Sequence, residues 1–227
     1  MKNIRHMIVV AGPSGVGKST LITQIARGEH PELSRTLGFD SGTIWEKRSA
    51  SQLERSAAIT KSFDNLIFHY DIMRPVLRRY RDGYIADPAL KSLDQAARLS
   101  IVSLWAPDDA LITRLSTRTS LPFRRSLTPL NFPVRIARKR RYARLRRLYR
   151  RPQAVSQQYA SWFDFTQDRQ PTCEQHLVVD VSNNVIRFTT ISEWLAAPHH
   201  DRAQSPDGSC GCGGGGGGGC SHGRAAQ

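Results

Sequence analysis

The sequence predicts a three-layer α/β sandwich built around a mostly parallel, five-stranded sheet. Two observations support this fold class. Short apolar runs alternate along the chain with longer segments of mixed polarity, as in proteins whose strands and helices alternate. A glycine-rich loop also stands between the first apolar run and a segment that can begin a helix. With 227 residues, the chain can bury a full core. We expect one main domain, residues 1–198, followed by a tail, residues 199–227.

The expected strands are short runs rich in apolar and β-branched residues. They are residues 7–11, a weaker run at 35–39, and residues 66–71, 101–105 and 176–181. Helices are expected to begin at Lys18, to run from Pro75 to a stop at Gly83, and to cover residues 191–197.

The glycine-rich loop has the spacing of a phosphate-binding motif. Residues 12–20 read G-P-S-G-V-G-K-S-T, and the motif is G-x-x-x-x-G-K-[ST]. Glycines allow the backbone N–H groups and the following helix N-terminus to converge on phosphates. Lys18 is expected to contact the β- and γ-phosphates, and the Ser19 hydroxyl to bind Mg²⁺. We expect ATP and Mg²⁺ to bind through the whole loop, which comprises Gly12, Pro13, Ser14, Gly15, Val16, Gly17, Lys18, Ser19 and Thr20.

The loop resembles that of guanylate kinase and related small kinases of the P-loop NTPase superfamily. Residues 101–118 read I-V-S-L-W-A-P-D-D-A-L-I-T-R-L-S-T-R. They look like the strand, acidic turn and helix that lead into the lid of nucleoside monophosphate, gluconate and shikimate kinases. The resemblance covers under half of the chain. It implies strand order 2-3-1-4-5, a kinase activity, and stabilisation of the transferred phosphoryl group by Arg114, Arg118 and Arg124.

The chain departs from guanylate kinase itself. Residues 34–36 are similar to the start of the guanine-binding pattern, but residues 37–40, L-G-F-D, do not continue it. Shikimate and gluconate kinases place an aspartate at the end of the second strand to handle the acceptor hydroxyl. Asp40 occupies a similar place, so the resemblance implies that Asp40 is the acceptor base. An Asx turn beside Gly42 is an equally good interpretation.

Asp71 closes an apolar strand and is the expected second magnesium-site residue. A carboxylate at the end of such a strand can orient Mg²⁺ through water. The alternative is structural, because an aspartate a few residues before Pro75 can also cap a helix.

The positive charge is concentrated in one segment. The chain has a formal net charge of +14, and residues 110–163 hold fourteen Lys and Arg but no Asp or Glu. Within this segment, residues 132–151 are expected to form an arginine-rich helix with an apolar stripe. Three interpretations are open: a solvated helix that packs on the sheet, a lid (about residues 119–165), or a docking surface for nucleic acid or an anionic membrane. We expect the lid.

The tail is of low complexity and contains seven consecutive glycines at 213–219, so we expect it to be disordered. Its cysteines and His222 are formally sufficient for a zinc site, but their C-x-C spacing favours a flexible extension. No apolar run reaches the roughly 20 residues of a membrane span, and residues 1–11 leave no room for a cleavable signal. We expect a cytoplasmic protein.

These features together predict a magnesium-dependent kinase. It would transfer the γ-phosphoryl group of ATP to a small, anionic or hydroxylated acceptor. The alternative is a regulatory NTPase whose arginine-rich helix docks on nucleic acid or an anionic membrane.

Overall fold

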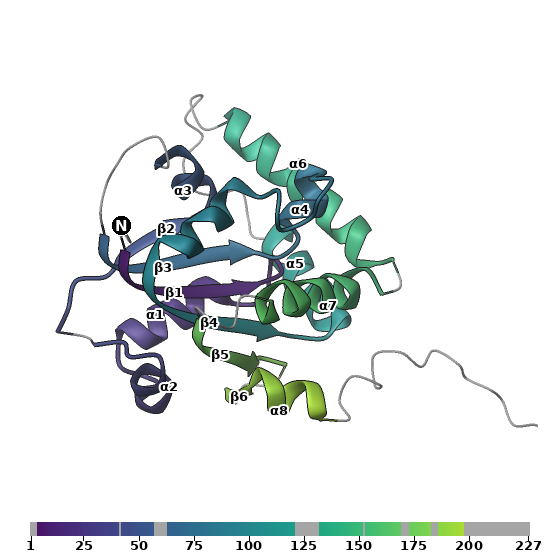
Figure 1. The fold of residues 1–227 in the computed structure, drawn as a ribbon. Helices are drawn as coiled ribbons and strands as arrows, with labels where there is room; N and C mark the ends of the chain where they lie inside the picture. The colour runs from purple at the N-terminus through teal and green to yellow at the C-terminus, as the bar shows by residue number, and fades with distance from the viewer. Residues whose placement is uncertain are drawn as a thin grey trace, which may run out of the picture.

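A computed structural model describes residues 4–40, 42–56, 63–120, 132–151, 153–168, 173–182 and 186–197. Within these ranges, six strands form one sheet in the order β2-β3-β1-β4-β5-β6 (Figure 1). Neighbours from β2 to β5 are parallel, and β6 runs antiparallel to β5. The strands are β1 (Ile4–Gly12), β2 (Glu46–Ser49), β3 (Phe63–Asp71), β4 (Ala96–Trp105), β5 (Cys173–Asp180) and β6 (Arg187–Thr190). The α/β class and the mostly parallel sheet are therefore confirmed, and the arrangement is consistent with three layers.

Helices alternate with the strands along most of the chain. They are α1 (Lys18–Ala26), α2 (Pro31–Thr36), α3 (Ala50–Ser56), α4 (Arg74–Arg78), the 3-10 helix η1 (Pro88–Gln95), α5 (Asp108–Ser120), α6 (Phe132–Tyr149), α7 (Ala154–Gln167) and α8 (Ile191–Ala196). The arrowheads of β1, β3 and β4 point toward α4, α5, α6 and α7, whereas α2 lies at the opposite end of the sheet (Figure 1).

The predicted second strand at residues 35–39 is wrong. The chain there forms α2, which begins with Pro31 and carries Glu32 in its first turn and Arg35 in its last. Pro31 favours the first turn because its ring holds φ near the helical value. The charges of Glu32 and Arg35 are opposite to the partial charges of the helix dipole at their respective ends. The second strand is β2, whose sequence E-K-R-S has no apolar run. With β2 in that place, the order 2-3-1-4-5 holds, and the sixth strand, β6, extends the predicted five-stranded sheet.

The helix expected to run from Pro75 to Gly83 is also shorter than predicted. Helix α4 ends at Arg78 because Arg79 adopts a left-handed conformation with φ of 59°. The backbone N–H groups of Arg79 and Tyr80 donate to the carbonyl oxygens of Val76 (3.3 Å) and Pro75 (3.0 Å), which closes the helix, and the chain continues as turns to η1.

The core lies on both faces of the central strands. On β1, Val9 faces one side of the sheet and Ile8 and Val10 face the other, and all three are buried, as expected for parallel strands covered on both sides. Aromatic residues of α7 complete one side of this core. The Trp162 ring, also fully buried, stacks on Tyr70 of β3 with ring centroids 5.3 Å apart.

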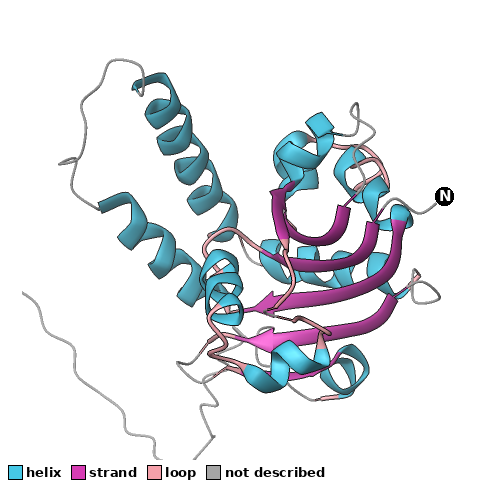
Figure 2. Ribbon diagram, turned by 90° about the vertical axis from the view of Figure 1, so that its left-hand side faces the viewer, coloured by secondary structure: helices cyan, strands magenta, loops and turns pink. Residues whose placement is uncertain are grey.

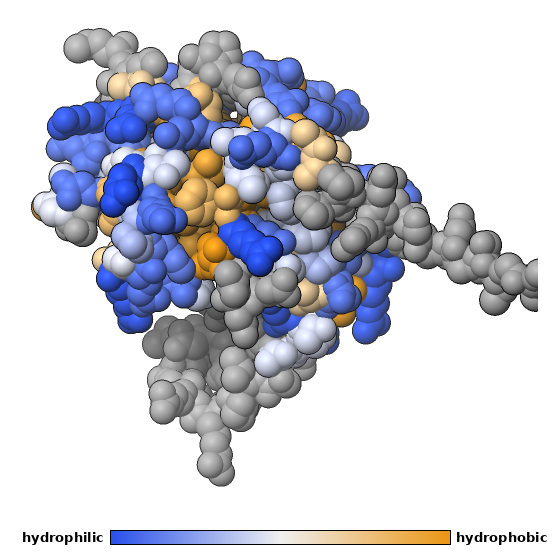
Figure 3. Space-filling view, turned by 90° about the horizontal axis from the view of Figure 1, so that it is seen from below, coloured by the Kyte–Doolittle hydropathy of each residue, from blue (hydrophilic) through white to orange (hydrophobic). Residues whose placement is uncertain are grey.

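Two long helices extend away from the body of the protein. Figure 2 shows α5 and α6 projecting together from the sheet. Figure 3 shows the side of the molecule on which α2, β6 and α8 lie in Figure 1. There a small group of hydrophobic side chains is surrounded by hydrophilic ones. No helix among the described residues is both long and apolar enough to cross a membrane.

A buried carboxylate joins β3, α4 and η1. Asp87 is completely buried and accepts hydrogen bonds from the Tyr70 hydroxyl (2.8 Å), Arg74 Nε (2.7 Å) and the Ala89 backbone N–H (3.0 Å). Arg74 also donates to Glu54 of α3 at 2.7 Å. Burial and the hydrogen bond to Asp87 raise the pKa of Tyr70 well above its usual value. This network fixes the start of α4 against β3.

Replacing Asp87 with Ala should destabilise the fold, because Arg74 and Tyr70 would lose a buried acceptor. Breaking a buried ion pair from one side costs about 3–5 kcal/mol, which urea denaturation would measure. Asp82→Ala is the matched control, since Asp82 is an exposed aspartate in the same loop region. Equal stability of the two variants would contradict a structural role for the network.

Candidate functional site

The glycine-rich loop joins the end of β1 to the start of α1. Gly12 has a φ of 149°, a conformation that side chains rarely adopt. A Cβ at Gly12 would also lie 2.8 Å from the carbonyl oxygen of Leu104. The first glycine of the loop is therefore required both by its backbone angle and by the close approach of β4.

Lys18 is buried beneath this loop. Its Nζ donates to the carbonyl oxygens of Gly12 and Pro13, both at 2.7 Å. Ser19 and Thr20 are exposed on the first turn of α1. The residue before the helix, Gly17, provides no side-chain cap. The N-terminus of α1 thus presents backbone N–H groups and the Ser19 hydroxyl beside the Lys18 ammonium.

Asp71 lies at the end of β3, directly opposite Gly12 of β1. Its Oδ2 accepts from the Ser14 hydroxyl at 2.6 Å and from Arg141 Nη2 at 2.8 Å. Its Oδ1 accepts from the backbone N–H of Met73 at 3.2 Å. The N-cap residue of α4 is Met73, without a side-chain cap. Asp71 therefore links the loop to α6, and it is not the N-cap of α4.

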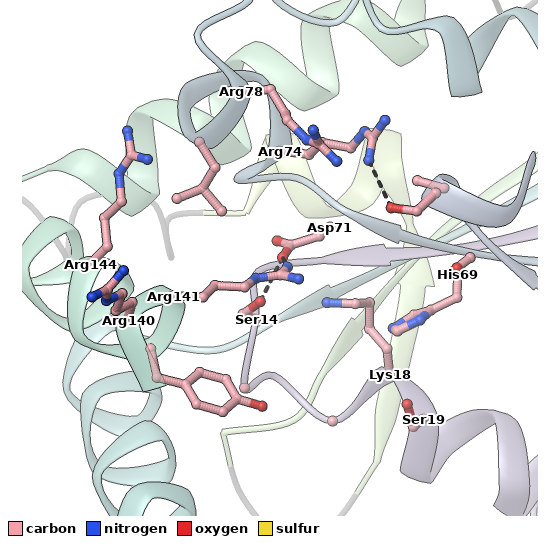
Figure 4. A pocket seen from close by; sticks show the side chains of 17 residues that line it. Ser14, Lys18, Ser19, His69, Asp71, Arg74, Arg78, Arg140, Arg141 and Arg144 are labelled. Atoms are coloured by element: carbon pink, nitrogen blue, oxygen red, sulfur yellow. Dashed lines mark hydrogen bonds and ion pairs between the residues drawn. The ribbon is translucent and has the colours of Figure 1, made fainter. Parts of the chain in front are cut away.

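These groups line a pocket of about 680 Å³. Figure 4 shows Asp71 at its centre, with Lys18 and His69 on one side and the arginines of α6 on the other. Among the described residues, the lining carries six cationic side chains and one carboxylate, that of Asp71. The cationic residues are Lys18, Arg74, Arg78, Arg140, Arg141 and Arg144. The pocket is thus strongly positive and suits an anionic ligand.

His69 adds no charge to the pocket at neutral pH. Burial, and then the neighbouring Lys18 ammonium, lower the pKa of His69 to about 4. The imidazole is therefore neutral at pH 7, and the positive charge of the site comes from lysine and arginine.

The arginine-rich helix reaches the pocket through one part of its surface. Arg140, Arg141 and Arg144 line the pocket, whereas Leu145 and Tyr149 are buried against the body. The Tyr149 hydroxyl donates to the carbonyl oxygen of Ser14 at 3.1 Å. Burial and the nearby Asp71 raise the pKa of Tyr149 far above its usual value, so the hydroxyl stays protonated and can donate. Helix α6 is thereby attached to the glycine-rich loop.

Of the three arginines expected to stabilise a phosphoryl group, the structure describes the side chain of Arg114 alone. Arg114 donates to the carbonyl oxygens of Val16 (3.1 Å) and Val181 (2.6 Å). Its guanidinium therefore fastens the loop to the end of β5 and is not among the described residues that line the pocket. Arg118 lies on α5, but its side chain is outside the description, as are Arg124 and the tail with its cysteines.

Asp40 does not reach the pocket. It is exposed, its Oδ1 accepts from the backbone N–H of Gly42 at 2.8 Å, and its carbonyl oxygen accepts from Trp45 Nε1. Trp45 packs against His6, near the start of β1. Asp40 thus lies in an Asx turn near the end of the sheet opposite the loop, and the structure does not bring it together with the other predicted site residues. Residues 31–36 form α2, so Asp40 does not stand at the end of a second strand.

Several residues that line the pocket were not predicted from the sequence as site residues. Ser49 and Ser51 come from the junction of β2 and α3, Arg74 and Arg78 from α4, and Arg140, Arg141 and Arg144 from α6. One signal was available in the sequence. Arg140 and Arg144 are four residues apart on the expected helix and so share a face.

The side-chain oxygens of Ser19 and Asp71 fit a magnesium ion that is also bound by the phosphates of a nucleotide. Ser19 and Asp71 line the same pocket and offer the oxygen ligands that Mg²⁺ prefers. Mg²⁺ commonly takes only one or two carboxylates together with substrate phosphates. Within the described ranges there is no group of three or more His, Cys, Asp or Glu that could hold a metal ion.

No model of a known protein family matches this chain, and no curated protein matches it either. The function is therefore argued from the geometry of the site.

Replacing Gly12 with Ala should distort the loop, because the new Cβ would meet the Leu104 carbonyl. Overpacking of this kind costs about 1–3 kcal/mol, measured by urea denaturation. Gly17→Ala is the control, since Gly17 also has a positive φ but has nothing within 4 Å of the added Cβ. If both variants lost the same stability, the contact with β4 would not constrain the loop.

Proposed function

We propose that this protein is a P-loop kinase that transfers the γ-phosphoryl group of ATP to a hydroxyl-bearing acceptor. The observation that carries the proposal is the convergence of three features on one pocket. These are the G-x-x-x-x-G-K-[ST] loop, the Ser19–Asp71 oxygen donors, and the arginines of α6.

The loop supplies the nucleotide site. Lys18 Nζ, which donates to two loop carbonyls in this structure, turns to the β- and γ-phosphates when ATP binds. Backbone N–H groups of the loop and of the first turn of α1 hold the phosphate oxygens. Arg114 keeps the loop in place through its bond to the Val16 carbonyl.

Ser19 and Asp71 are the residues that would hold magnesium. When bound, the ion neutralises charge on the β- and γ-phosphates. Arg141 competes for the same carboxylate oxygen of Asp71 in this structure. If Asp71 held the metal, Arg141 would be free to pair with the oxygens of the transferred group.

Helix α6 acts as the lid of the site. Arg140, Arg141 and Arg144 surround the end of the pocket away from the loop, where the negative charge of the transition state must be stabilised. They take the place proposed from the sequence for Arg124, while Arg118 remains a further proposed contributor from α5. A pocket of about 680 Å³ leaves room beside a triphosphate for a small acceptor, or for the small reacting end of a larger one.

Lys18→Ala should weaken ATP binding, because a buried, charge-assisted contact to the phosphates is lost. Hydrogen bonds to charged groups contribute about 1.5–3 kcal/mol, and isothermal titration calorimetry would measure the difference. Lys91→Ala, an exposed lysine on η1, should bind ATP like the wild type. Equal ATP affinity in Lys18→Ala and the wild type would disprove the nucleotide site.

Asp71→Asn should keep the fold and lose magnesium-dependent release of ADP from ATP. The amide has one acceptor oxygen in place of two, so it can keep the hydrogen bond from Ser14 or the one from Met73 but not both, and it is a poorer ligand for Mg²⁺ than a carboxylate. Asp64→Asn, at the exposed start of the same strand, is the control. A variant that loses thermal stability but keeps turnover would show that Asp71 has only a structural role.

A further inference from the structure

A row of arginines continues along α6 beyond the pocket. Arg140, Arg144 and Arg147 are spaced by four and three residues, which places them on one side of the helix, and Arg151 follows in the turn after the helix ends at Tyr149. All four are exposed. The first two line the pocket, and the other two lie outside its lining. A lid over a small ligand accounts for the first pair and leaves the second pair unexplained.

Within the described part of the chain, no ion pair neutralises this row. Residues 110–163 contain no Asp or Glu, and none of the ion pairs among the described residues involves these four arginines. Like charges one helical turn apart repel one another. An uninterrupted array of this kind fits a partner that carries several negative charges in a line.

The outward side of α6 does not suit a membrane surface. Membrane-binding helices insert an apolar face beside their basic one. Here Leu145 and Tyr149 are buried against the body of the protein. Ile136, 36% exposed, is the one large apolar side chain exposed on the described part of α6. A partner bound through guanidinium groups alone is the better fit, and the planar arginine fork matches phosphate.

We propose that the row binds single-stranded nucleic acid and that the strand's terminal hydroxyl enters the pocket as the phosphoryl acceptor. This inference rests on the proposed function, for which it names the acceptor class. Successive backbone phosphates would pair with Arg151 and Arg147, and the end of the strand would lie between Arg144 and Arg140. A repeating phosphate chain that ends in a hydroxyl accounts for both the row and the pocket.

The transfer is balanced as an ordinary phosphoryl exchange. The terminal hydroxyl oxygen forms a bond to the γ-phosphorus of ATP, and the bond from that phosphorus to the β,γ-bridging oxygen breaks. The electron pair leaves with ADP, and the hydroxyl proton is released to water. No other reactant is required.

Binding is tested with a labelled single-stranded oligonucleotide over a range of salt concentrations. The logarithm of the binding constant should fall with the logarithm of salt concentration by about 0.7 per phosphate contact. Removing two contacts in Arg147→Gln/Arg151→Gln should therefore make that slope shallower by about 1.4. The matched control is Arg5→Gln/Arg35→Gln, two exposed arginines, at the start of β1 and on α2, that take part in none of the described ion pairs. ATP affinity should be unchanged in both double variants.

The outcomes separate this inference from the proposed function. Radiolabelled γ-phosphate should move from ATP to an oligonucleotide with free terminal hydroxyls, and not to one blocked at both ends. An oligonucleotide that does not bind, binds without accepting phosphate, or loses equal affinity in both double variants would overturn the inference. Equal or tighter binding of anionic phospholipid vesicles or of poly-glutamate would overturn it as well. If wild-type protein fails to bind ATP, the proposed function itself falls, whatever the oligonucleotide does.

Discussion

The register between β1 and β3 is the constraint on which the site depends. Gly12 and Asp71 are paired positions of adjacent parallel strands, so the loop and the carboxylate leave the sheet at the same level. Ser14 can then reach Asp71 at 2.6 Å, and Arg141 can reach the same oxygen from α6. A shift of one residue would turn Asp71 to the other face of the sheet. The pocket would then lose the one carboxylate among its described lining residues.

The arginines around the pocket fall into two kinds. Arg74 is almost completely buried and held by Asp87 and Glu54, so its guanidinium is fixed and already neutralised. Arg140 and Arg144 are exposed and take part in none of the described ion pairs. An arginine that is already paired with a protein carboxylate gains little interaction energy from an anionic ligand, whereas an arginine without an ion pair gains more. The affinity of the pocket for anions therefore resides in α6 more than in α4.

Local sequence patterns were sufficient for the centre of the fold and failed at its edges. Strands β1, β3, β4 and β5 are apolar because neighbours cover them on both faces, so composition reveals them. Strand β2, E-K-R-S, is held by pairing with β3, which leaves no local signal. The role expected of Asp40 depended on a strand at residues 35–39, where the chain instead forms the end of α2. Arg74 and Arg141 could not be assigned, because their positions depend on contacts with residues far away in the sequence.

The same contacts couple α6 to the loop. Ser14 donates its hydroxyl to Asp71, which also holds Arg141, and its carbonyl oxygen accepts from Tyr149. One residue of the loop thus makes contact with two positions of α6, two turns apart, one directly and one through a carboxylate. A ligand that reorganises Ser14 must alter both contacts together. The buried Leu145 lies between these positions and resists sliding of the helix.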